Sequence, residues 1–202
     1  DNKFYNPDFD KKLNTSDDWI TARTGIKARH FADEKEKTSD LAIAAGKMAL
    51  SETNIKPNAI DAIIVATSTP DQTFPSTATR VQFGLGMTTG YAFDIQAVCT
   101  GFIYALANAN ALIRSGQAKR VMVIGAEIFS RILDWTDRST CVLFGDGAGA
   151  PNAQATFEVD SKRELVTFEM FKPKLADSNQ TLSFKVRGIG KKTKDLLTGL
   201  RN

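Results

Sequence analysis

Histidine and cysteine are scarce in this chain of 202 residues, which contains one histidine, His30, and two cysteines, Cys99 and Cys141. A single histidine excludes a metal site built from several histidines, and we expect no metal or resident cofactor. Two distant cysteines fit a reducing compartment better than a disulfide scaffold. No apolar run approaches the length of a membrane span, and the opening residues lack the features of a signal peptide. We therefore expect a cytoplasmic protein with no membrane partner.

The chain also has little net charge, because its 26 basic residues nearly balance its 23 acidic ones. The small basic excess belongs to the end of the chain, where residues 151–202 hold ten Lys or Arg against six Asp or Glu. The pattern changes at the same point. Residues before about 150 alternate between helical and strand-like segments, whereas later segments alternate with a period of two. We expect two domains, 1–150 and a basic, β-rich tail at 151–202.

The first 150 residues predict an α/β fold with a mainly parallel sheet, because helices and buried strands alternate along them. Apolar residues at helical spacing, with capping and stop residues, mark the helices. Short β-branched runs mark the strands. The expected helices cover 39–53, 75–86 (with Pro75 in the first turn) and the stretch from Cys99 to 115; the expected strands cover 59–69, 91–97, 119–127 and 139–150, the last entering a glycine-rich turn.

Cys99 stands between an expected strand and an expected helix, in the phrase DIQAVCTGF. The N–H groups and dipole at a helix start favour an anion, so a thiol there ionises more readily and becomes a better nucleophile. A small residue filling a tight turn is the other interpretation, because free cysteines are usually buried and inert. Local sequence leaves both open.

Four segments in this order resemble the β-ketoacyl-acyl carrier protein synthase III family of thiolase-fold condensing enzymes. They are TSDDWITARTGIKARHF (15–31), DIQAVCTGF (94–102), VMVIGAE (121–127) and DWTDRSTCVLFGDGAGA (134–150). The resemblance covers about residues 10–150, the N-terminal half of such an enzyme apart from its first strand. It implies a thiolase-like layered fold, with one half of a pseudo-duplicated core. It also implies that a short acyl-CoA such as acetyl-CoA is joined to malonyl-acyl carrier protein, with release of CO₂, to start fatty-acid chains.

The resemblance assigns roles to five residues. Cys99 matches the nucleophile that accepts the acyl group, and Trp19, Arg23 and Arg138 match residues that hold CoA, by stacking on adenine and contacting phosphate. Phe74 matches a position that closes the acyl pocket of the partner across a homodimer. Acyl-CoA is thus a substrate and no cofactor is implied. Cys141 is expected in a buried strand, and His30 at the surface or an interface.

The family also uses a histidine and an asparagine from its C-terminal half, and no histidine follows His30. We therefore expect that this chain alone does not condense. It fits a fragment or chimera of a synthase, a half-synthase needing another chain, or a degenerate homologue. A non-catalytic acyl-CoA-binding or assembly module is the alternative. Nucleic-acid binding through VRGIGKKTKDLL (186–197) is a weaker one. A nucleotide loop at FGDGAGA (144–150) is rejected, because its glycines lack the required spacing, and a tight turn is expected there.

Overall fold

The structure is a computed structural model that describes residues 2–9 and 13–150 and, beyond them, three strands at 156–160, 165–171 and 181–186. Contacts between residues divide the chain into two compact units, Asp1–Ala150 and Pro151–Asn202. The five residues to which the family resemblance assigns a role all lie in the first unit.

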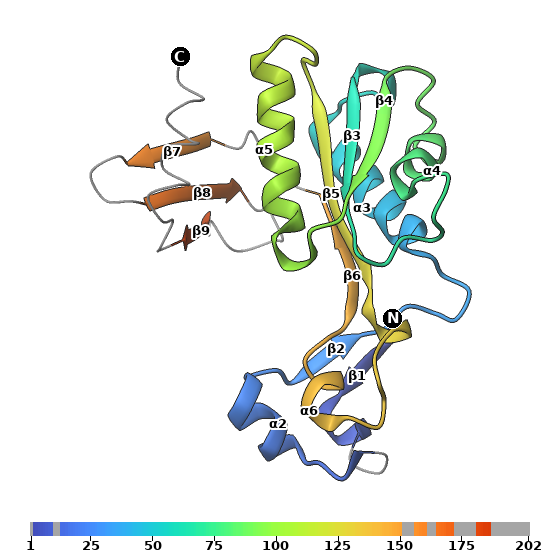
Figure 1. The fold of residues 1–202 in the computed structure, drawn as a ribbon, viewed down its shortest axis with the longest axis vertical. Helices are drawn as coiled ribbons and strands as arrows, with labels where there is room; N and C mark the ends of the chain where they lie inside the picture. The colour runs from blue at the N-terminus through green and yellow to red at the C-terminus, as the bar shows by residue number, and fades with distance from the viewer. Residues whose placement is uncertain (1, 10–12, 151–155, 161–164, 172–180, 187–202) are drawn as a thin grey trace. The chain divides into compact units, whose positions relative to one another are not determined.

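A four-stranded sheet forms the centre of the first unit (Figure 1). Its order is β4-β3-β5-β6, with bounds Tyr91–Ile95, Ala62–Ala66, Val121–Ile128 and Asp146–Gly149. Strand β3 pairs in parallel with β4 and β5, whereas β6 pairs antiparallel with β5. All of β3 is buried, as its uninterrupted apolar run predicts for a strand covered on both faces. The predicted mainly parallel sheet is confirmed.

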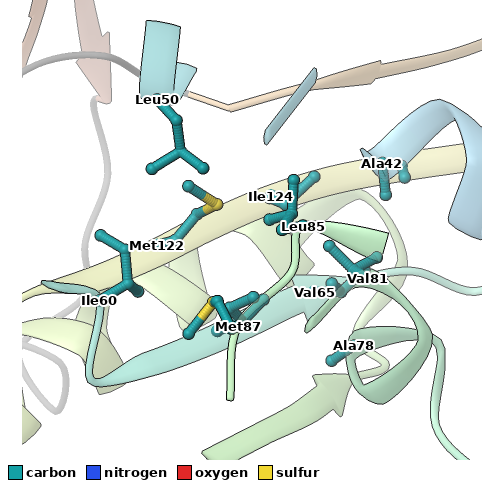
Figure 2. Close-up of a cluster of buried hydrophobic side chains, with 12 residues drawn as sticks. Ala42, Leu50, Ile60, Val65, Ala78, Val81, Leu85, Met87, Met122 and Ile124 are labelled. Atoms are coloured by element: carbon teal, nitrogen blue, oxygen red, sulfur yellow. The ribbon is translucent and has the colours of Figure 1, made fainter. Parts of the chain in front are cut away.

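Helices cover both faces of this sheet. Helices α3 (Thr38–Thr53) and α4 (Thr77–Gly84) lie on one face, and α5 (Gly101–Arg114) lies on the other (Figure 1). Ile63 and Val65 of β3 pack against α3 and α4 in a cluster of buried side chains (Figure 2). On the opposite face, a Cβ added to Gly101 of α5 would meet the Cβ of Ala66 at 3.5 Å. The three predicted helices are confirmed, and they make an α/β/α layering.

The start of α4 differs from the prediction. Ser76 is the N-cap of the helix, so Pro75 lies before the cap and not in the first turn. The carboxylate of Asp94, on β4, accepts hydrogen bonds from the N–H groups of Thr77 (2.8 Å) and Ala78 (2.7 Å). These side chains satisfy the first free N–H groups of the helix, and this decides where it begins.

The predicted strand over 139–150, with its glycine-rich turn, is wrong. Residues Arg138–Cys141 form the short helix α6, and the glycine run is itself strand β6. The Asp137 side chain accepts hydrogen bonds from Ser139 N (2.9 Å) and Thr140 Oγ1 (2.7 Å), which stabilise a helical start. The glycine run adopts an extended conformation because it pairs with β5. Cys141 is buried, as predicted, but on a helix.

The chain on either side of these layers builds a small subdomain, which we define as the described residues of 2–37 and 129–145 (Figure 1). It contains helices α2 (Asp17–Thr24) and α6, and 3-10 turns at Asn6–Phe9 and Phe129–Arg131. Strands β1 (Lys3–Tyr5) and β2 (Ala28–His30) pair antiparallel within it. Its buried apolar residues come from both segments and are Phe9, Leu13, Ile20, Cys141 and Val142.

Arg29 joins the two segments of the small subdomain. It is buried, and its guanidinium donates to Asn6 Oδ1 (3.2 Å) and to the carbonyl oxygen of Val142 (2.8 Å). The same group lies 4.8 Å from the centre of the Phe9 ring. Desolvation by burial lowers the pKa of Arg29 below its usual range. The subdomain is therefore held together around one buried cation.

Asp61 joins the beginnings of the three parallel strands. Its carboxylate accepts hydrogen bonds from Lys119 N (2.7 Å) and Arg120 N (2.8 Å), just before β5. Its carbonyl oxygen accepts one from Tyr91 N (3.2 Å), the first residue of β4. The hydrogen bonds from the Arg120 and Lys119 amides lower the pKa of Asp61, because they favour its ionised form.

The second unit contains an antiparallel sheet in the order β7-β8-β9, with bounds Thr156–Asp160, Leu165–Phe171 and Thr181–Val186. These strands coincide with the three segments that alternate with a period of two. The basic motif at 187–197, which carries the nucleic-acid hypothesis, lies outside the described residues.

Candidate active site

Cys99 lies in a turn between β4 and α5. The sequence predicts Cys99 in the first turn of the helix, but Cys99 lies in a single 3-10 turn, Val98–Thr100, that precedes α5. Val98 has φ 47°, in the left-handed region that β-branched residues rarely adopt. Such backbone strain is concentrated at functional sites. The thiol is exposed, which contradicts the buried-filler interpretation of Cys99.

A cavity of about 240 Å³ opens beside Cys99. Residues from five places surround it: the end of β3, the cysteine turn, the start of α5, the second half of β5 and the glycine run of β6. They are Ala66, Val98, Cys99, Phe102, Gly125, Ala126, Glu127, Gly147, Ala148 and Gly149. A Cβ added at Gly147 or Gly149 would meet nothing within 4 Å. The β6 wall therefore leaves open space next to the thiol.

The N–H groups of the turn are partly used within it. Thr100 N donates to the Ala97 carbonyl oxygen (3.1 Å), and Gly101 N donates to that of Val98. These two groups would have to change partners to bind an oxyanion at Cys99.

Glu127 is a polar residue of the cavity that the sequence analysis missed. Its carboxylate accepts hydrogen bonds from Ser68 N (2.8 Å) and Thr69 Oγ1 (2.6 Å), in the loop that follows β3. It thereby fixes this loop against β5. The signal available in the sequence was an acidic residue ending a strand, in VMVIGAE, because polar residues at the carboxyl ends of parallel strands often line sites.

The three residues that the resemblance assigns to CoA lie together in the small subdomain. The guanidinium carbon of Arg23 lies 4.3 Å from the centre of the Trp19 ring, and that of Arg138 lies 4.9 Å from it. Arg23 also donates to the Trp19 carbonyl oxygen (3.2 Å), and Arg138 donates to that of Asn14. Trp19 is half-buried and both arginines are exposed. One aromatic ring and two cations thus lie together.

The other predicted residues do not line the cavity. Phe74 is 81% exposed, in the loop before α4. His30 is exposed on β2, as predicted. Cys141 is fully buried, and its pKa is raised by desolvation and then by Asp137. The cavity of Cys99 and the Trp19 cluster are therefore two separate features of one unit.

The described residues contain neither a membrane-spanning helix nor a cluster of metal ligands. No helix there is both long enough and apolar enough to cross a bilayer. No group of three or more His, Cys, Asp or Glu side chains within those same ranges could hold a metal ion.

Known sequences match most of the length of this chain. The family model described as 3-Oxoacyl-[acyl-carrier-protein (ACP)] synthase III matches residues 93–171. The Beta-ketoacyl-[acyl-carrier-protein] synthase III of Ruegeria pomeroyi is 69% identical over 145 residues, which cover 72% of this chain and 45% of that protein. The protein of the same name from Jannaschia sp. is 71% identical over 138 residues, 68% of this chain and 42% of that one. The chain spans less than half the length of these curated relatives.

Solved structures of synthase III proteins also match this chain. The 3-oxoacyl-[acyl-carrier-protein] synthase III of Aquifex aeolicus VF5 matches with a TM-score of 0.72 at 56% identity, over 74% of this chain and 48% of that one. The synthase III of Thermus thermophilus matches with a TM-score of 0.72 at 45% identity, over 84% of this chain and 52% of that one.

Proposed function

Because this chain belongs to the 3-oxoacyl-[acyl-carrier-protein] synthase III family, and its first unit has the thiolase-like fold, we propose that it accepts an acyl group from acyl-CoA on Cys99. The observation that carries the proposal is an exposed thiol, on a strained turn, beside an open cavity. Acylation of Cys99 by acetyl-CoA is the experiment that tests it, and it is developed in the Discussion.

The proposed step is a thioester exchange. The sulfur of ionised Cys99 attacks the carbonyl carbon of the acyl-CoA thioester, and a tetrahedral oxyanion forms. The bond from that carbon to the CoA sulfur then breaks. CoA leaves as a thiolate and takes up the proton that Cys99 released, so no further reactant is needed. A soft nucleophile that is also a good leaving group suits this reaction.

The Trp19 cluster is proposed to hold the nucleotide part of CoA. An adenine ring stacks on an indole, and a guanidinium covers or pairs with the groups around it. We expect Trp19→Ala to weaken CoA binding about tenfold, since stacking and cation–π contacts contribute about 1–2 kcal/mol. Isothermal titration calorimetry with CoA measures this change.

Trp135→Ala is the matched control for Trp19. Trp135 is the other tryptophan of the chain, lies in the same subdomain and packs against Phe9 and Phe31. Its loss should leave CoA affinity within about twofold. Equal weakening in both variants would contradict the assignment of the nucleotide to Trp19.

Condensation is proposed for the whole protein of this family, with malonyl-acyl carrier protein as the second substrate and chain initiation as the role. The relatives' printed names support this activity, but this chain matches less than half their length. Its only histidine, His30, is exposed and does not line the Cys99 cavity. For the chain of 202 residues we therefore propose acylation without a ketoacyl product, in the cytoplasm.

A non-catalytic acyl-CoA-binding module is the second candidate. The separation of the Trp19 cluster from Cys99 favours it, because CoA could bind through the cluster alone. Such a module binds acetyl-CoA equally well as wild type and as Cys99→Ala, and it never becomes acylated. The enzyme becomes acylated, and Cys99→Ala abolishes this.

A homodimer is proposed through the β4 edge of the sheet. Among the strands that the structure describes, β4 has a neighbour on one side only, which leaves a free edge. Large side chains near it are exposed: Phe74 (81%) and Phe83 (89%), while Tyr91 and Phe93 stack along the strand. Exposed apolar groups beside a free edge fit a second copy better than solvent.

We expect Phe74→Ala to raise the dissociation constant of this dimer about tenfold, because a largely exposed aromatic ring would be buried at the interface. Met48→Ala, which removes an exposed side chain of α3 (63% exposed), is the control and should have no effect. Sedimentation equilibrium separates the two. A monomeric wild type would contradict the proposed dimer outright.

A further inference from the structure

One carboxylate links the sheet that carries Cys99 to the small subdomain that carries Trp19. Asp146 is the first residue of β6, and its Oδ1 accepts a hydrogen bond from Ser130 N (2.8 Å). Its Oδ2 accepts from Ser130 Oγ (2.6 Å) and from Ala32 N (2.8 Å). Ala32 follows β2 and Ser130 follows β5. Asp146, at the start of β6, thus holds two segments of the subdomain that are far apart in the sequence.

A second contact joins the two segments of the small subdomain next to this junction. The Arg131 guanidinium, next to Ser130, donates through Nη2 to the carbonyl oxygens of Asp33 (3.0 Å), Glu34 (3.1 Å) and Glu36. The junction is also tight, because a Cβ added to Gly145 would lie 3.2 Å from the His30 carbonyl oxygen. Segments far apart in the sequence are therefore held in one arrangement here.

We propose that Asp146 is a positioning residue for acyl transfer, which fixes the small subdomain so that a thioester held by the Trp19 cluster reaches Cys99. This inference rests on the proposed function, because it assumes acylation of Cys99 from CoA. Asp146 itself does not line the Cys99 cavity. The cavity wall that follows it, Gly147–Gly149, is held separately by its pairing with β5.

Loss of the Asp146 carboxylate should affect two acyl donors differently. The rate of acylation by acetyl-CoA depends on the distance between the nucleotide site and Cys99, because a misplacement of about 1 Å can lower a rate about 100-fold. A small acetyl thioester without a nucleotide, S-acetyl-N-acetylcysteamine, reaches Cys99 without the subdomain. Asp146→Asn should therefore slow acylation by saturating acetyl-CoA by about 10–100-fold, and acylation by the small thioester by less than about threefold.

Asp61→Asn is the matched control. Asp61 is also a carboxylate that accepts two backbone N–H groups and joins segments far apart in the sequence, but it lies at the other end of the strands. It should leave the ratio of the two acylation rates unchanged. Ser130→Ala, which removes only one of the three hydrogen bonds to Asp146, should change this ratio in the same direction as Asp146→Asn and by less.

Amide hydrogen exchange provides a readout that does not depend on acylation. The Ala32 and Ser130 N–H groups should exchange at least about tenfold faster in Asp146→Asn, whereas those of β3 should not change. An unchanged ratio of rates, an equal fall with both donors, or unchanged exchange at both amides would overturn the inference. A wild-type protein that neither donor acylates would instead refute the proposed function, and exchange would still decide whether Asp146 holds the junction.

Discussion

Incubation with acetyl-CoA is expected to add one acetyl group to the chain, on Cys99. The thiol is exposed and borders an open cavity, so a thioester carbonyl can approach it. Intact-mass spectrometry counts the added groups, and peptide mapping locates them. Cys99→Ser should lower the rate of labelling by at least about two orders of magnitude, because removal of the nucleophile eliminates the step itself.

Cys141 provides an internal control for this experiment. It is fully buried, and desolvation raises the pKa of its thiol, so it has neither access to acyl-CoA nor a readily formed thiolate. Cys141→Ala should therefore keep full labelling. A label on Cys141, or equal labelling of Cys99→Ser and wild type, would show that acylation does not follow the geometry of the turn. A ketoacyl product from malonyl-acyl carrier protein would refute the expectation that this chain stops at acylation.

Replacement of Gly90 by alanine is expected to destabilise the fold strongly. Gly90 precedes β4 and has φ 81°. A Cβ there would fall well inside 3.0 Å of the Asp61 carbonyl oxygen, the group that also accepts the hydrogen bond from Tyr91. The left-handed backbone costs about 1–2 kcal/mol for alanine, and the clash with backbone adds about as much or more. We expect a fall of about 3 kcal/mol in the free energy of unfolding.

Gly86→Ala is the matched control, because Gly86 has φ 74° but open space around its Cα. It should lose only the conformational part, about 1–2 kcal/mol. Urea denaturation followed by circular dichroism measures both values. Equal losses in the two variants would mean that the approach of Gly90 to Asp61 is relaxed by a small backbone shift.

The layered part of the fold could be predicted from the sequence because its signals are local. The run AIIVA is apolar throughout and becomes the fully buried β3. The spacing of Leu106 and Ala109 gives α5 its buried side. By contrast, α6 depends on the Asp137 side chain, and β6 depends on a partner strand about 20 residues earlier. Neither the capping geometry nor the long-range pairing follows from the period of hydrophobicity.

Some features of the candidate site could likewise be predicted from the sequence, and others could not. The strand-to-helix position of Cys99 follows from neighbouring residues, although the 3-10 turn and the strained Val98 do not. No local pattern brings Arg138 to Trp19, and the family resemblance alone placed them in one group. Glu127 and Asp146 were missed because their hydrogen-bond partners are set by tertiary structure.

The two-segment build of the small subdomain has a consequence for synthesis on the ribosome. Its defining contacts join residues far apart in the chain: Arg29 bonds Val142 across 113 positions, and Arg138 bonds Asn14 across 124. Contacts of such long range form late and slowly, since the intervening loop must close first. Helix α2 therefore cannot pack into the complete subdomain, and Ile20 and Trp19 stay exposed, until translation has passed residue 142. A nascent chain therefore completes the Trp19 cluster only after the three parallel strands β3, β4 and β5 have been made.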